Sequence, residues 1–413
     1  MKKIYLLLCI TFVRITASAQ WETVYFPTFG TQLGNLVAVN FSDFNNGLAV
    51  GDSFPGTSPT PLILKTSDNG TTWNSVFGTA MAGTFTDVVY TTPFIAYAVG
   101  YHYSSNTGFI SKSLDGGNTW STITFPALFI KVSFPSLNIG YVNASNGSIY
   151  KTTDGGISWN PFSTPLSSLS QIEFINDTIG FASGIDTIIK TIDGGLSWSS
   201  YAFQQQGFLR IDFASDSIGY ALFSDFGKSY LYKTIDQGVN WYSLGIAATA
   251  PAYTTAINFP NDNVGFICGQ FQMYKTTDGG ISWNAQTAKP PGWPNFFDDL
   301  MDLYFLNQDT GFAVGFNQYY RTSSGGLNFS ENLNSKSTIS LYPNPGQDQI
   351  TLTLNFRINN SHVTIYDCFG KKVYSSILVN NEEKIDCGLF TPGIYFVTVN
   401  DGAKPYSKKL IIE

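Results

Sequence analysis

The 413-residue chain carries 22 lysines and arginines against 29 aspartates and glutamates, which gives a net charge of −7. Residues 20–334 hold 11 of the basic residues and 22 of the acidic ones, and no basic stripe runs through them. This charge argues against nucleic acid and anionic membrane surfaces as partners. The chain has only two histidines and no Cys-x-x-Cys pair, so we exclude a zinc site and expect no cofactor.

The first 19 residues have the features of a secretory signal peptide. A basic start is followed by an apolar run and by the cleavage pattern Ala17-Ser18-Ala19. Cys9 lies inside the apolar run rather than at the cleavage point, which argues against a lipoprotein. No later stretch reaches ~18 consecutive apolar residues. We therefore expect an exported protein without a transmembrane helix.

A decapeptide, KTTDGGISWN, occurs unchanged at residues 151–160 and 275–284. Related copies start at residues 65, 112, 190 and 233, and a degraded copy starts at Arg321. Six copies keep both an aspartate and a tryptophan: Asp68 and Trp73, Asp115 and Trp120, Asp154 and Trp159, Asp193 and Trp198, Asp236 and Trp241, Asp278 and Trp283. The tryptophan positions lie 39 to 47 residues apart, a period typical of repeat folds.

Each period contains four short apolar runs separated by Asn, Asp and Gly turns, which is a strand pattern. Upstream of the decapeptide, an aromatic residue, a polar turn and a Gly-aromatic-small-x-Gly stretch recur, as at residues 41–51 and 174–184. No segment shows a period of 3.6, so we expect almost no helix. Four antiparallel strands in each of seven units predict an all-β fold, a seven-bladed β-propeller over residues 20–334.

The decapeptide fits a tight hairpin between the third and fourth strands of a unit. Asp154 is expected to accept hydrogen bonds from backbone N–H groups of the turn. Gly155 and Gly156 permit positive φ angles, and Trp159 is expected to bury its ring between neighbouring blades. We therefore interpret the aspartates and tryptophans of the decapeptide as structural residues.

The pattern formed by Thr152, Asp154, Gly156, Ser158 and Trp159 resembles the Asp-box (BNR) repeat. Sialidases, two-propeller xyloglucanases, sortilin-type receptors and the photosystem II assembly-factor propellers carry such boxes. The resemblance implies that the boxes lie at the periphery of the propeller, away from any substrate site.

Residues 21–26 resemble a fourth strand that lacks its decapeptide, while the last copy has Ser324 and Phe329 where the others have Asp and Trp. We infer that residues 21–26 complete the seventh blade and so close the ring.

Propeller geometry puts the fourth-to-first and second-to-third connections on the face opposite the decapeptides. Several of these loops are enlarged, and binding residues concentrate on such loops. The candidate ligand-binding residues are Tyr101, His102, Tyr103, Trp293, Phe296, Phe297, Asp298 and Asp299. Their aromatic rings suit stacking on a sugar or on a partner's side chain. The alternative is that these rings only pack the loops onto the blades.

A sialidase is excluded, because that resemblance implies three arginines and residues 20–334 hold only Arg210 and Arg321. Hydrolysis of a neutral glycan by a pair of carboxylates stays open, with Asp298, Asp299 and Asp302 as candidates. A calcium site in the same acidic loop also stays open. We expect a non-catalytic binding or scaffold protein with a glycan or protein ligand, and a secreted glycoside hydrolase acting on a neutral polysaccharide is the alternative.

Residues 335–413 form a separate module of alternating apolar runs that predicts a small antiparallel β-sandwich. The module resembles the type A C-terminal sorting domain of the type IX secretion system. The residues that carry this resemblance are Tyr342-Pro343-Asn344-Pro345, Asp367, Gly370-Lys371-Lys372, Gly393-Ile394-Tyr395 and Lys408 to Ile412. It implies a bacterium of the Bacteroidota type, handling by the type IX machinery, and release or attachment at the outer cell surface. An ordinary binding sandwich is the alternative.

Three cysteines follow the predicted signal peptide. Cys368 and Cys387 lie on predicted strands that can be neighbours, and an exported protein permits a disulfide. Buried free thiols are equally ordinary for cysteine, so the sequence leaves this pairing open.

Overall fold

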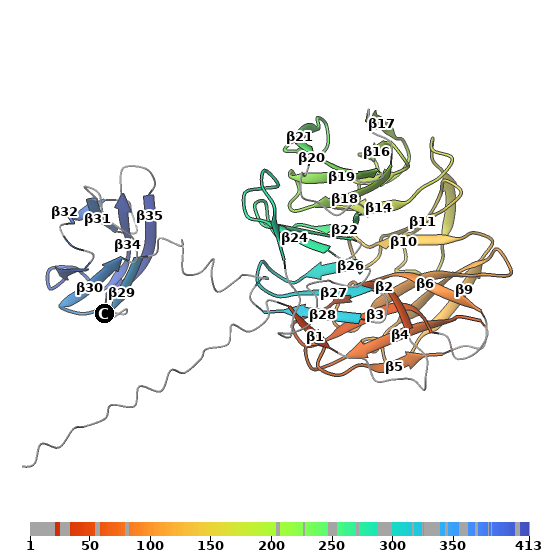
Figure 1. Ribbon diagram of the computed structural model, residues 1–413, viewed down its shortest axis with the longest axis horizontal. Helices are drawn as coiled ribbons and strands as arrows, with labels where there is room; N and C mark the ends of the chain where they lie inside the picture. Colours follow the sequence, from red (N-terminus) through yellow and green to blue (C-terminus); the bar gives the residue numbers. More distant parts are fainter. Residues whose placement is uncertain are drawn as a thin grey trace, which may run out of the picture. The chain divides into compact units, whose positions relative to one another are not determined.

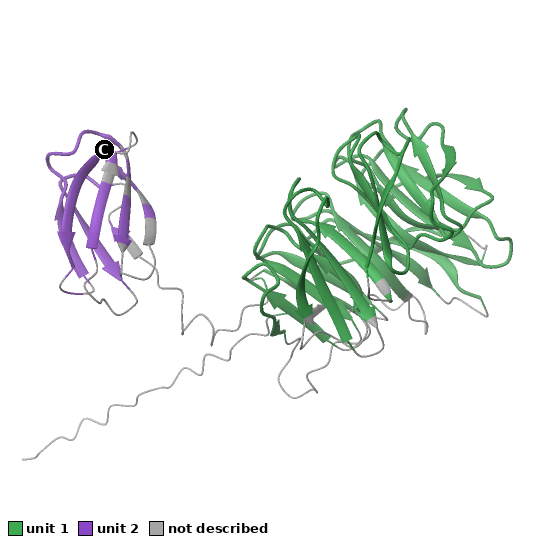
Figure 2. Ribbon diagram, turned by 90° about the horizontal axis from the view of Figure 1, so that it is seen from above, with its two compact units in different colours: residues 1–326 green, residues 327–413 purple. Residues whose placement is uncertain are grey.

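A computed structural model describes residues 21–24, 34–53, 58–78, 82–203, 207–225, 228–246, 254–269, 272–286, 300–315, 318–323, 325, 339–342, 346–354, 362–367, 371–378, 380, 382–400 and 405–412. The chain divides into two compact units, residues 1–326 and 327–413 (Figure 2). All regular elements in the described ranges are β-strands, which confirms the predicted all-β class. The predicted signal peptide, residues 1–19, lies outside these ranges.

Over the described ranges, no helix is long and apolar enough to cross a bilayer.

The first unit consists of four-stranded antiparallel sheets, seven of them over the described residues (Figure 1). In six of these sheets, neighbouring strands follow one another along the chain. The seventh sheet has β1, from the start of the chain, as its outer strand. The first strands are β2 Gly34–Phe41, β6 Gly83–Tyr90, β10 Phe129–Ser133, β14 Gln171–Phe174, β18 Phe208–Phe213, β22 Thr254–Asn258 and β26 Leu300–Phe305. The second strands are β3 Gly47–Ser53, β7 Ala96–His102, β11 Gly140–Ala144, β15 Gly180–Ser183, β19 Gly219–Asp225, β23 Gly265–Gly269 and β27 Gly311–Gly315.

The outer half of each sheet follows the same order. The third strands are β4 Thr60–Thr66, β8 Gly108–Ser113, β12 Ser148–Thr152, β16 Thr187–Thr191, β20 Lys228–Thr234, β24 Gln272–Thr276 and β28 Gln318–Thr322. The fourth strands are β5 Asn74–Phe77, β9 Ser121–Phe125, β13 Asn160–Ser163, β17 Ser199–Ala202, β21 Tyr242–Ile246 and β25 Asn284–Ala285. The sheet of β26, β27 and β28 takes its fourth strand, β1 Glu22–Val24, from the start of the chain.

The first strands contact one another in sequence, from β2 through β6, β10, β14, β18 and β22 to β26, and β26 contacts β2. This is the arrangement of a β-propeller, in which sheets pack face to face around an axis lined by their first strands. β1 pairs antiparallel with β28, and Glu22 lies opposite Arg321. The prediction that residues 21–26 supply the missing fourth strand of the last sheet is therefore confirmed for Glu22–Val24, and residues 25 and 26 lie outside the described ranges.

A recurring set of three aromatic rings joins six of the seven described sheets to the one before, and the sheet β6–β9 instead packs Tyr90 and Trp120 in a cluster with Leu48. Phe134, which follows β10, stacks on Tyr97 of the preceding sheet with 3.9 Å between ring centroids. The same ring meets Trp159 of its own sheet edge-to-face at 5.8 Å. We call such a set an aromatic triad. The other triads are Phe312–Phe41–Trp73, Tyr141–Phe174–Trp198, Phe181–Phe213–Trp241, Tyr220–Phe259–Trp283 and Phe266–Phe305–Trp21.

Trp21 completes the triad of the last sheet. Its side chain is fully buried and meets Phe305 edge-to-face at 5.8 Å, the same centroid distance as that between Trp159 and Phe134. Trp21 thus takes the place of the tryptophan that the degraded decapeptide lacks, which explains why that copy can have Phe329 instead.

Six second strands open with a glycine that the central ring of the triad requires, whereas β7, in the sheet without a triad, opens with Ala96. A Cβ atom at Gly180 would collide with the Phe174 ring, and one at Gly265 would collide with Phe259. This close approach explains the aromatic–turn–glycine pattern in the sequence, because any larger residue would push the ring off its stacking partner.

The first residue of the decapeptide ties its sheet to the next. Lys151 Nζ donates to the Gly194 carbonyl at 2.7 Å and lies 5.2 Å from the centroid of the Tyr141 ring. In the last sheet, Arg321 Nη1 donates to the Asn69 carbonyl of the first sheet at 3.0 Å. The same kind of contact therefore recurs where the two ends of the propeller sequence meet.

Acidic side chains near the axis accept backbone N–H groups from the neighbouring first strand. Glu173 Oε1 accepts from the Phe213 N–H at 3.1 Å, and Asp212 Oδ2 accepts from the Phe259 N–H at 2.6 Å. Burial raises the pKa of Asp212 to about 7. Burial, reinforced by the charge of Asp212, raises the pKa of Glu173 well above its usual value. Both shifts favour the protonated form of these carboxyl groups.

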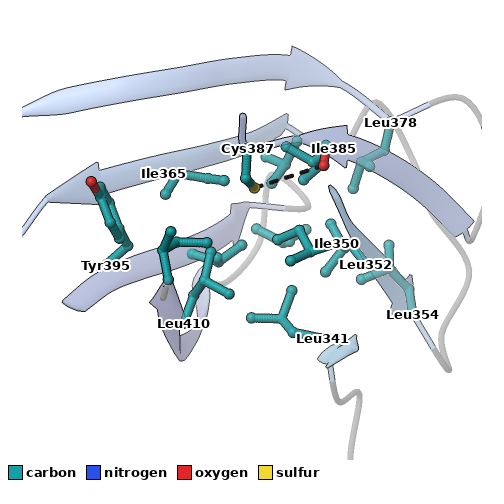
Figure 3. Close-up of a cluster of buried hydrophobic side chains, with 14 residues drawn as sticks. Leu341, Ile350, Leu352, Leu354, Ile365, Leu378, Ile385, Cys387, Tyr395 and Leu410 are labelled. Atoms are coloured by element: carbon teal, nitrogen blue, oxygen red, sulfur yellow. Dashed lines mark hydrogen bonds between the residues drawn. The ribbon is translucent and has the colours of Figure 1, made fainter. Parts of the chain in front are cut away.

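The second unit is a β-sandwich of two antiparallel sheets. One contains β29 Ile339–Tyr342, β30 Gln349–Leu354 and β33 Glu382–Asp386, and the other contains β32 Lys372–Ile377, β31 His362–Asp367, β34 Gly393–Asn400 and β35 Pro405–Ile412. Figure 3 shows the core between them, where Ile350, Ile365 and Leu410 are buried. Cys387 is a free thiol in this core, with its Sγ 3.7 Å from the Ile385 carbonyl oxygen. Cys368, its possible disulfide partner, lies outside the described residues.

Replacement of Trp21 by alanine tests closure of the propeller. We expect the free energy of unfolding to fall by roughly 3–5 kcal/mol, because the substitution empties a fully buried tryptophan site. Trp159→Ala should cost a similar amount, since Trp159 has the equivalent place in its own triad. Ile123→Ala, on the exposed strand β9, should change little and serves as the control. Chemical denaturation of the full chain measures all three, and an unchanged value for Trp21→Ala would contradict the closure.

The Glu173–Asp212 pair predicts a pH dependence of stability. Because their pKa values are raised in the folded state, the folded protein keeps protons that the unfolded chain loses near pH 4. Their stabilising contribution is therefore complete below that pH, and it falls by on the order of 1 kcal/mol per pH unit as the pH rises towards about 7. Asp212→Asn should flatten this slope, and Asp216→Asn, at an exposed aspartate, should not. Melting temperatures recorded from pH 4 to 7 would refute the assignment if the two variants behave alike.

Candidate functional site

A polar cavity of about 320 Å³ lies at the axis of the propeller unit, where the first strands begin. Each first strand contributes at least one side chain: Val37, Thr86, Lys131, Gln171, Arg210, Thr255 and Asp302. The ends of second strands add Asp52 and Tyr101, and Tyr103 follows from the turn after β7. The cavity thus lies on the face of the second-to-third hairpins, the face on which the sequence predicted ligand binding.

β-Bulges at the same point in five first strands shape this cavity. The register shifts between Leu36 and Ala38, Phe85 and Asp87, Phe129 and Lys131, Thr254 and Ala256, and Leu300 and Asp302. A bulge bends its strand and redirects the neighbouring side chains. The skipped residue is a cavity residue in every case, so the bulges explain why side chains from several sheets converge at the axis.

The Arg210 guanidinium is held in place by carbonyl groups of two adjacent strands. Nε donates to the Thr255 carbonyl at 2.8 Å, and Nη1 donates to the Leu209 carbonyl at 3.3 Å. Burial lowers the pKa of Arg210, and the charge of Asp302 opposes this effect. The group stays charged, as arginine does in proteins. Two fixed nitrogens orient the guanidinium and leave Nη2 as a donor for a ligand in the cavity.

The carboxylates near Arg210 already serve the contacts between sheets. Lys131 Nζ forms an ion pair with Asp87 Oδ1 at 3.1 Å, and Asp87 Oδ2 accepts from the Val132 N–H at 2.9 Å. Asp302 Oδ2 accepts from the Val39 N–H at 3.0 Å across the junction between the last and first sheets. Burial raises the pKa of Asp302 to about 6, although the charge of Lys131 acts to lower it. Of the three predicted catalytic carboxylates, only Asp302 lies within the described residues. Its hydrogen bond to the Val39 N–H joins the last and first sheets.

The predicted loop aromatics Tyr101 and Tyr103 line the cavity, and their rings meet edge-to-face at 5.6 Å. Tyr103 Oη donates to Asp52 Oδ2 at 3.1 Å. Burial raises the pKa of Asp52, opposed by hydrogen bonds from Thr84 and Tyr103. His102 is not part of the cavity, because its ring is only 7% exposed and packs on Phe109 at 4.8 Å. The remaining candidates, Trp293, Phe296, Phe297, Asp298 and Asp299, lie outside the described residues.

The decapeptide residues lie at the opposite end of the sheets and make the bonds of a rigid turn. Asp154 Oδ1 accepts from the backbone N–H groups of Ile157 and Ser158 at 3.0 and 2.9 Å, and Oδ2 accepts from the Ser158 hydroxyl at 2.6 Å. The Ser158 hydroxyl and these N–H groups hold the pKa of Asp154 far below its usual value. Gly155 and Gly156 have φ angles of 66° and 79°, as the turn requires.

The other copies repeat this geometry. The aspartates Asp68, Asp115, Asp193, Asp236 and Asp278 each accept the backbone N–H four residues further on. The tryptophans Trp73, Trp120, Trp159, Trp198, Trp241 and Trp283 all belong to apolar clusters between sheets. These contacts agree with the structural interpretation of the decapeptide. Within the described residues, no group of three or more His, Cys, Asp or Glu side chains is placed to hold a metal ion.

Asp52, Lys131 and Arg210 line the cavity but were not predicted as site residues from the sequence. A signal for two of them exists, because Lys131 and Arg210 interrupt the apolar first run of their repeats near its start. Superimposing the repeats would have shown that this position is often polar, although not that these side chains meet at the axis.

Two family models match separate parts of the chain. Residues 158–295 match the photosynthesis system II assembly factor YCF48, and residues 340–413 match the secretion system C-terminal sorting domain. An endo-acting ulvan lyase of Formosa agariphila is 33% identical over 85 residues, which is 20% of this chain. The chain spans only 16% of the length of that relative.

Solved structures share the propeller fold at low sequence identity. "YCF48 bound to D1 peptide" is 17% identical with a TM-score of 0.56, covering 74% of this chain and 96% of that one. "YCF48 from Cyanidioschyzon merolae" is 20% identical with a TM-score of 0.55, covering 74% and 99%. The WD40 β-propeller domain of Doa1 is 12% identical with a TM-score of 0.53, covering 71% and 95%.

These likenesses agree with the packed sheets of the first unit and with the sandwich of the second. The sorting domain indicates export and a location at the outer surface or in the medium. The first unit thus has the β-propeller fold, with a YCF48-like match over residues 158–295, and residues 340–413 are the C-terminal sorting domain of the type IX secretion system.

Proposed function

We propose that this protein is a secreted or cell-surface binding propeller without a catalytic role, and that its closed ring has seven blades. Its ligand site is the axial cavity. The observation that carries this proposal is that the cavity receives polar side chains from all seven first strands of the described sheets, with Asn35 as the one from β2. The carboxylates that line it, Asp52 and Asp302, each accept a hydrogen bond from a neighbouring sheet.

A two-carboxylate hydrolase needs one free acid and one free base or nucleophile on opposite sides of the bond to be cleaved. The two carboxylates that line the cavity each have one oxygen in a bond between sheets, because Asp52 Oδ2 accepts from the Tyr103 hydroxyl and Asp302 Oδ2 accepts from the Val39 N–H. Asp87, the ion-pair partner of Lys131, uses both of its oxygens. Groups suited to recognition are Nη2 of Arg210 and the rings of Tyr101 and Tyr103. These groups favour an extracellular glycan or a protein segment as the ligand. The YCF48 structure with a D1 peptide is an example of a related propeller that holds a peptide.

A secreted glycoside hydrolase acting on a neutral polysaccharide is the second candidate. One observation favours it: burial raises the pKa of Asp302 to about 6, a value that suits a general acid near neutral pH. Binding and hydrolysis predict different results for the same two variants.

Arrays of neutral and acidic glycans and of peptides, read for both binding and product release, test the binding site. Arg210→Ala should weaken binding at least about tenfold, because a hydrogen bond to a charged group contributes ~1.5–3 kcal/mol. Asp302→Asn should leave binding within a few-fold, and Ile123→Ser on β9 is the matched control. Released product that disappears in Asp302→Asn would support the hydrolase instead. Equal binding by Arg210→Ala and the intact protein would rule out the cavity as the site.

Deletion of residues 338–413 tests the role of the sandwich in export. In a host with a type IX machinery, we expect the truncated propeller to accumulate folded in the periplasm, because the predicted signal peptide still directs it across the inner membrane. Fusing residues 338–413 to an unrelated folded protein with the same leader should send that protein to the surface or the medium. Cell fractionation and immunoblotting measure both. A truncated protein that still reaches the medium would mean that the sandwich is a second binding domain.

A further inference from the structure

The propeller unit exposes apolar side chains on the decapeptide turns of five consecutive sheets, beginning with Leu114 between β8 and β9. Their exposed fractions run from 60% to 87%. We call the part of this set on the last four of these sheets the apolar arc, and it contains Ile157, Ile192, Leu196, Ile235, Val239 and Ile281. Large exposed apolar groups gathered on one face mark interaction surfaces more often than chance exposure does.

The turn itself does not require these side chains. They occupy the third and seventh positions of the decapeptide, and their side chains make no hydrogen bond to the aspartate carboxylate, which binds Ile157 through its backbone N–H. In the first sheet, the same two positions hold Ser67 and Thr71. A polar residue is thus compatible with the fold at each position, so the fold alone does not account for the apolar arc.

The arc is continuous and lies on one side of the unit. In consecutive sheets, Gly155 N–H donates to the Asn138 carbonyl and Gly194 N–H donates to the Thr178 carbonyl, at 2.9 and 2.8 Å. These bonds put the decapeptide turn and the first-to-second hairpin on the same edge of each sheet. Lys151 then joins its turn to Gly194 of the next. The axial cavity lies at the other edge of the sheets.

The centre of the arc contains a groove of about 430 Å³ between the sheet of β14–β17 and the sheet of β18–β21. Ile192 and Val239 line it from two neighbouring turns, and Trp198 and Tyr201 line it from the strands below. An exposed apolar rim around an aromatic-lined groove is suited to receive one apolar anchor side chain of a partner.

The charge around the arc indicates the chemistry of the partner. The turns of these four sheets carry seven aspartates against four lysines at the adjoining strand ends: Asp154, Asp177, Asp193, Asp216, Asp236, Asp262 and Asp278, with Lys151, Lys190, Lys233 and Lys275. The Ser197 hydroxyl and N–H hold the pKa of Asp193 at about 2, and Asn240 does so for Asp236, so both are ionised at neutral pH.

Two of the four lysines are bound to the next sheet, because Lys151 Nζ and Lys275 Nζ donate to the carbonyls of Gly194 and Gly325. The other two lie over aromatic rings of their own sheets, Lys190 Nζ 5.8 Å from the Phe181 centroid and Lys233 Nζ 5.1 Å from that of Tyr220, and Lys190 also lines the groove. The seven aspartates still outnumber these four lysines. The rim of the arc is therefore acidic. Like charges oppose the docking of a second copy of this face or of an anionic bilayer, and a basic partner is favoured.

We propose that the apolar arc and its groove form a docking surface for a second protein, one that presents an apolar anchor side chain flanked by lysine or arginine. This surface is independent of the axial cavity, and its failure would leave the proposed ligand site untouched.

Fluorescence anisotropy with two labelled synthetic peptides tests this proposal on the full chain. One peptide alternates lysine with leucine, and its partner alternates glutamate with leucine. The first should bind, with an affinity that falls as salt is added, and the second should not. Combined Ile192→Ser, Leu196→Ser and Val239→Ser substitutions should weaken binding of the lysine peptide at least about tenfold. Combined Ile123→Ser, Ile377→Ser and Leu389→Ser substitutions, at exposed positions elsewhere and equally neutral in charge, should change it less than about twofold.

Further measurements separate the outcomes. Arg210→Ala should bind the lysine peptide normally, since the cavity is not involved. Equal binding by the arc variant and the intact protein, or equal binding of both peptides, would overturn the proposal. Self-association or vesicle binding that is lost in the arc variant would also overturn it, in favour of a second copy or a bilayer. If the triple variant melts below the intact protein, Leu196→Ser alone, at a site 87% exposed, supplies the comparison.

Discussion

Stacking of aromatic rings between consecutive sheets is the interaction on which the propeller unit depends. A four-stranded sheet has two apolar faces and can bury them only against its neighbours. In each aromatic triad, one phenylalanine touches the preceding sheet, the tryptophan of its own sheet and the glycine that opens the next strand. The whole period of the sequence follows from that contact. The tryptophan needs a rigid turn before it, which the decapeptide aspartate stabilises. The glycine position must lack a Cβ atom, because a Cβ would collide with the phenylalanine ring. The last triad is completed by Trp21, so the two ends of the propeller sequence are joined by burial as well as by strand pairing.

Side chains near the axis link the same sheets by hydrogen bonds. These bonds determine which polar groups remain available to a ligand in the cavity. Asp87, Asp212, Glu173 and Asp302 each accept a backbone N–H from a neighbouring sheet. An acidic axis is therefore explained by the assembly of the sheets without reference to catalysis. The assembly leaves the outer nitrogen of Arg210 and the rings of Tyr101 and Tyr103 at the cavity, and these are the groups that we propose bind the ligand.

The two edges of the sheets consequently offer different chemistry. One edge surrounds a polar cavity with a fixed guanidinium, and the other carries the apolar arc among ionised aspartates. A protein exported to the outer surface can use both at once, holding a small ligand or segment at one edge and a basic partner at the other. The sorting sandwich has its own apolar core, including Ile350, Ile365 and Leu410, and needs none of these groups to fold.

The repeat period, the strand class, the structural role of the decapeptide, the joining of the N-terminal strand to the last sheet and the sorting module all followed from the sequence, because each rests on local turn chemistry and on spacing along the chain. Tyr101 and Tyr103 were also identified, since they stand in an enlarged loop. Only the tertiary structure brought Lys131, Arg210 and Asp302 to one cavity and buried His102. Residues from different repeats meet at the axis through the ring of sheets and through bulges that redirect their side chains, and the raised pKa of Asp302 arises from burial there. The spacing of residues within a single repeat predicts neither this convergence nor this burial.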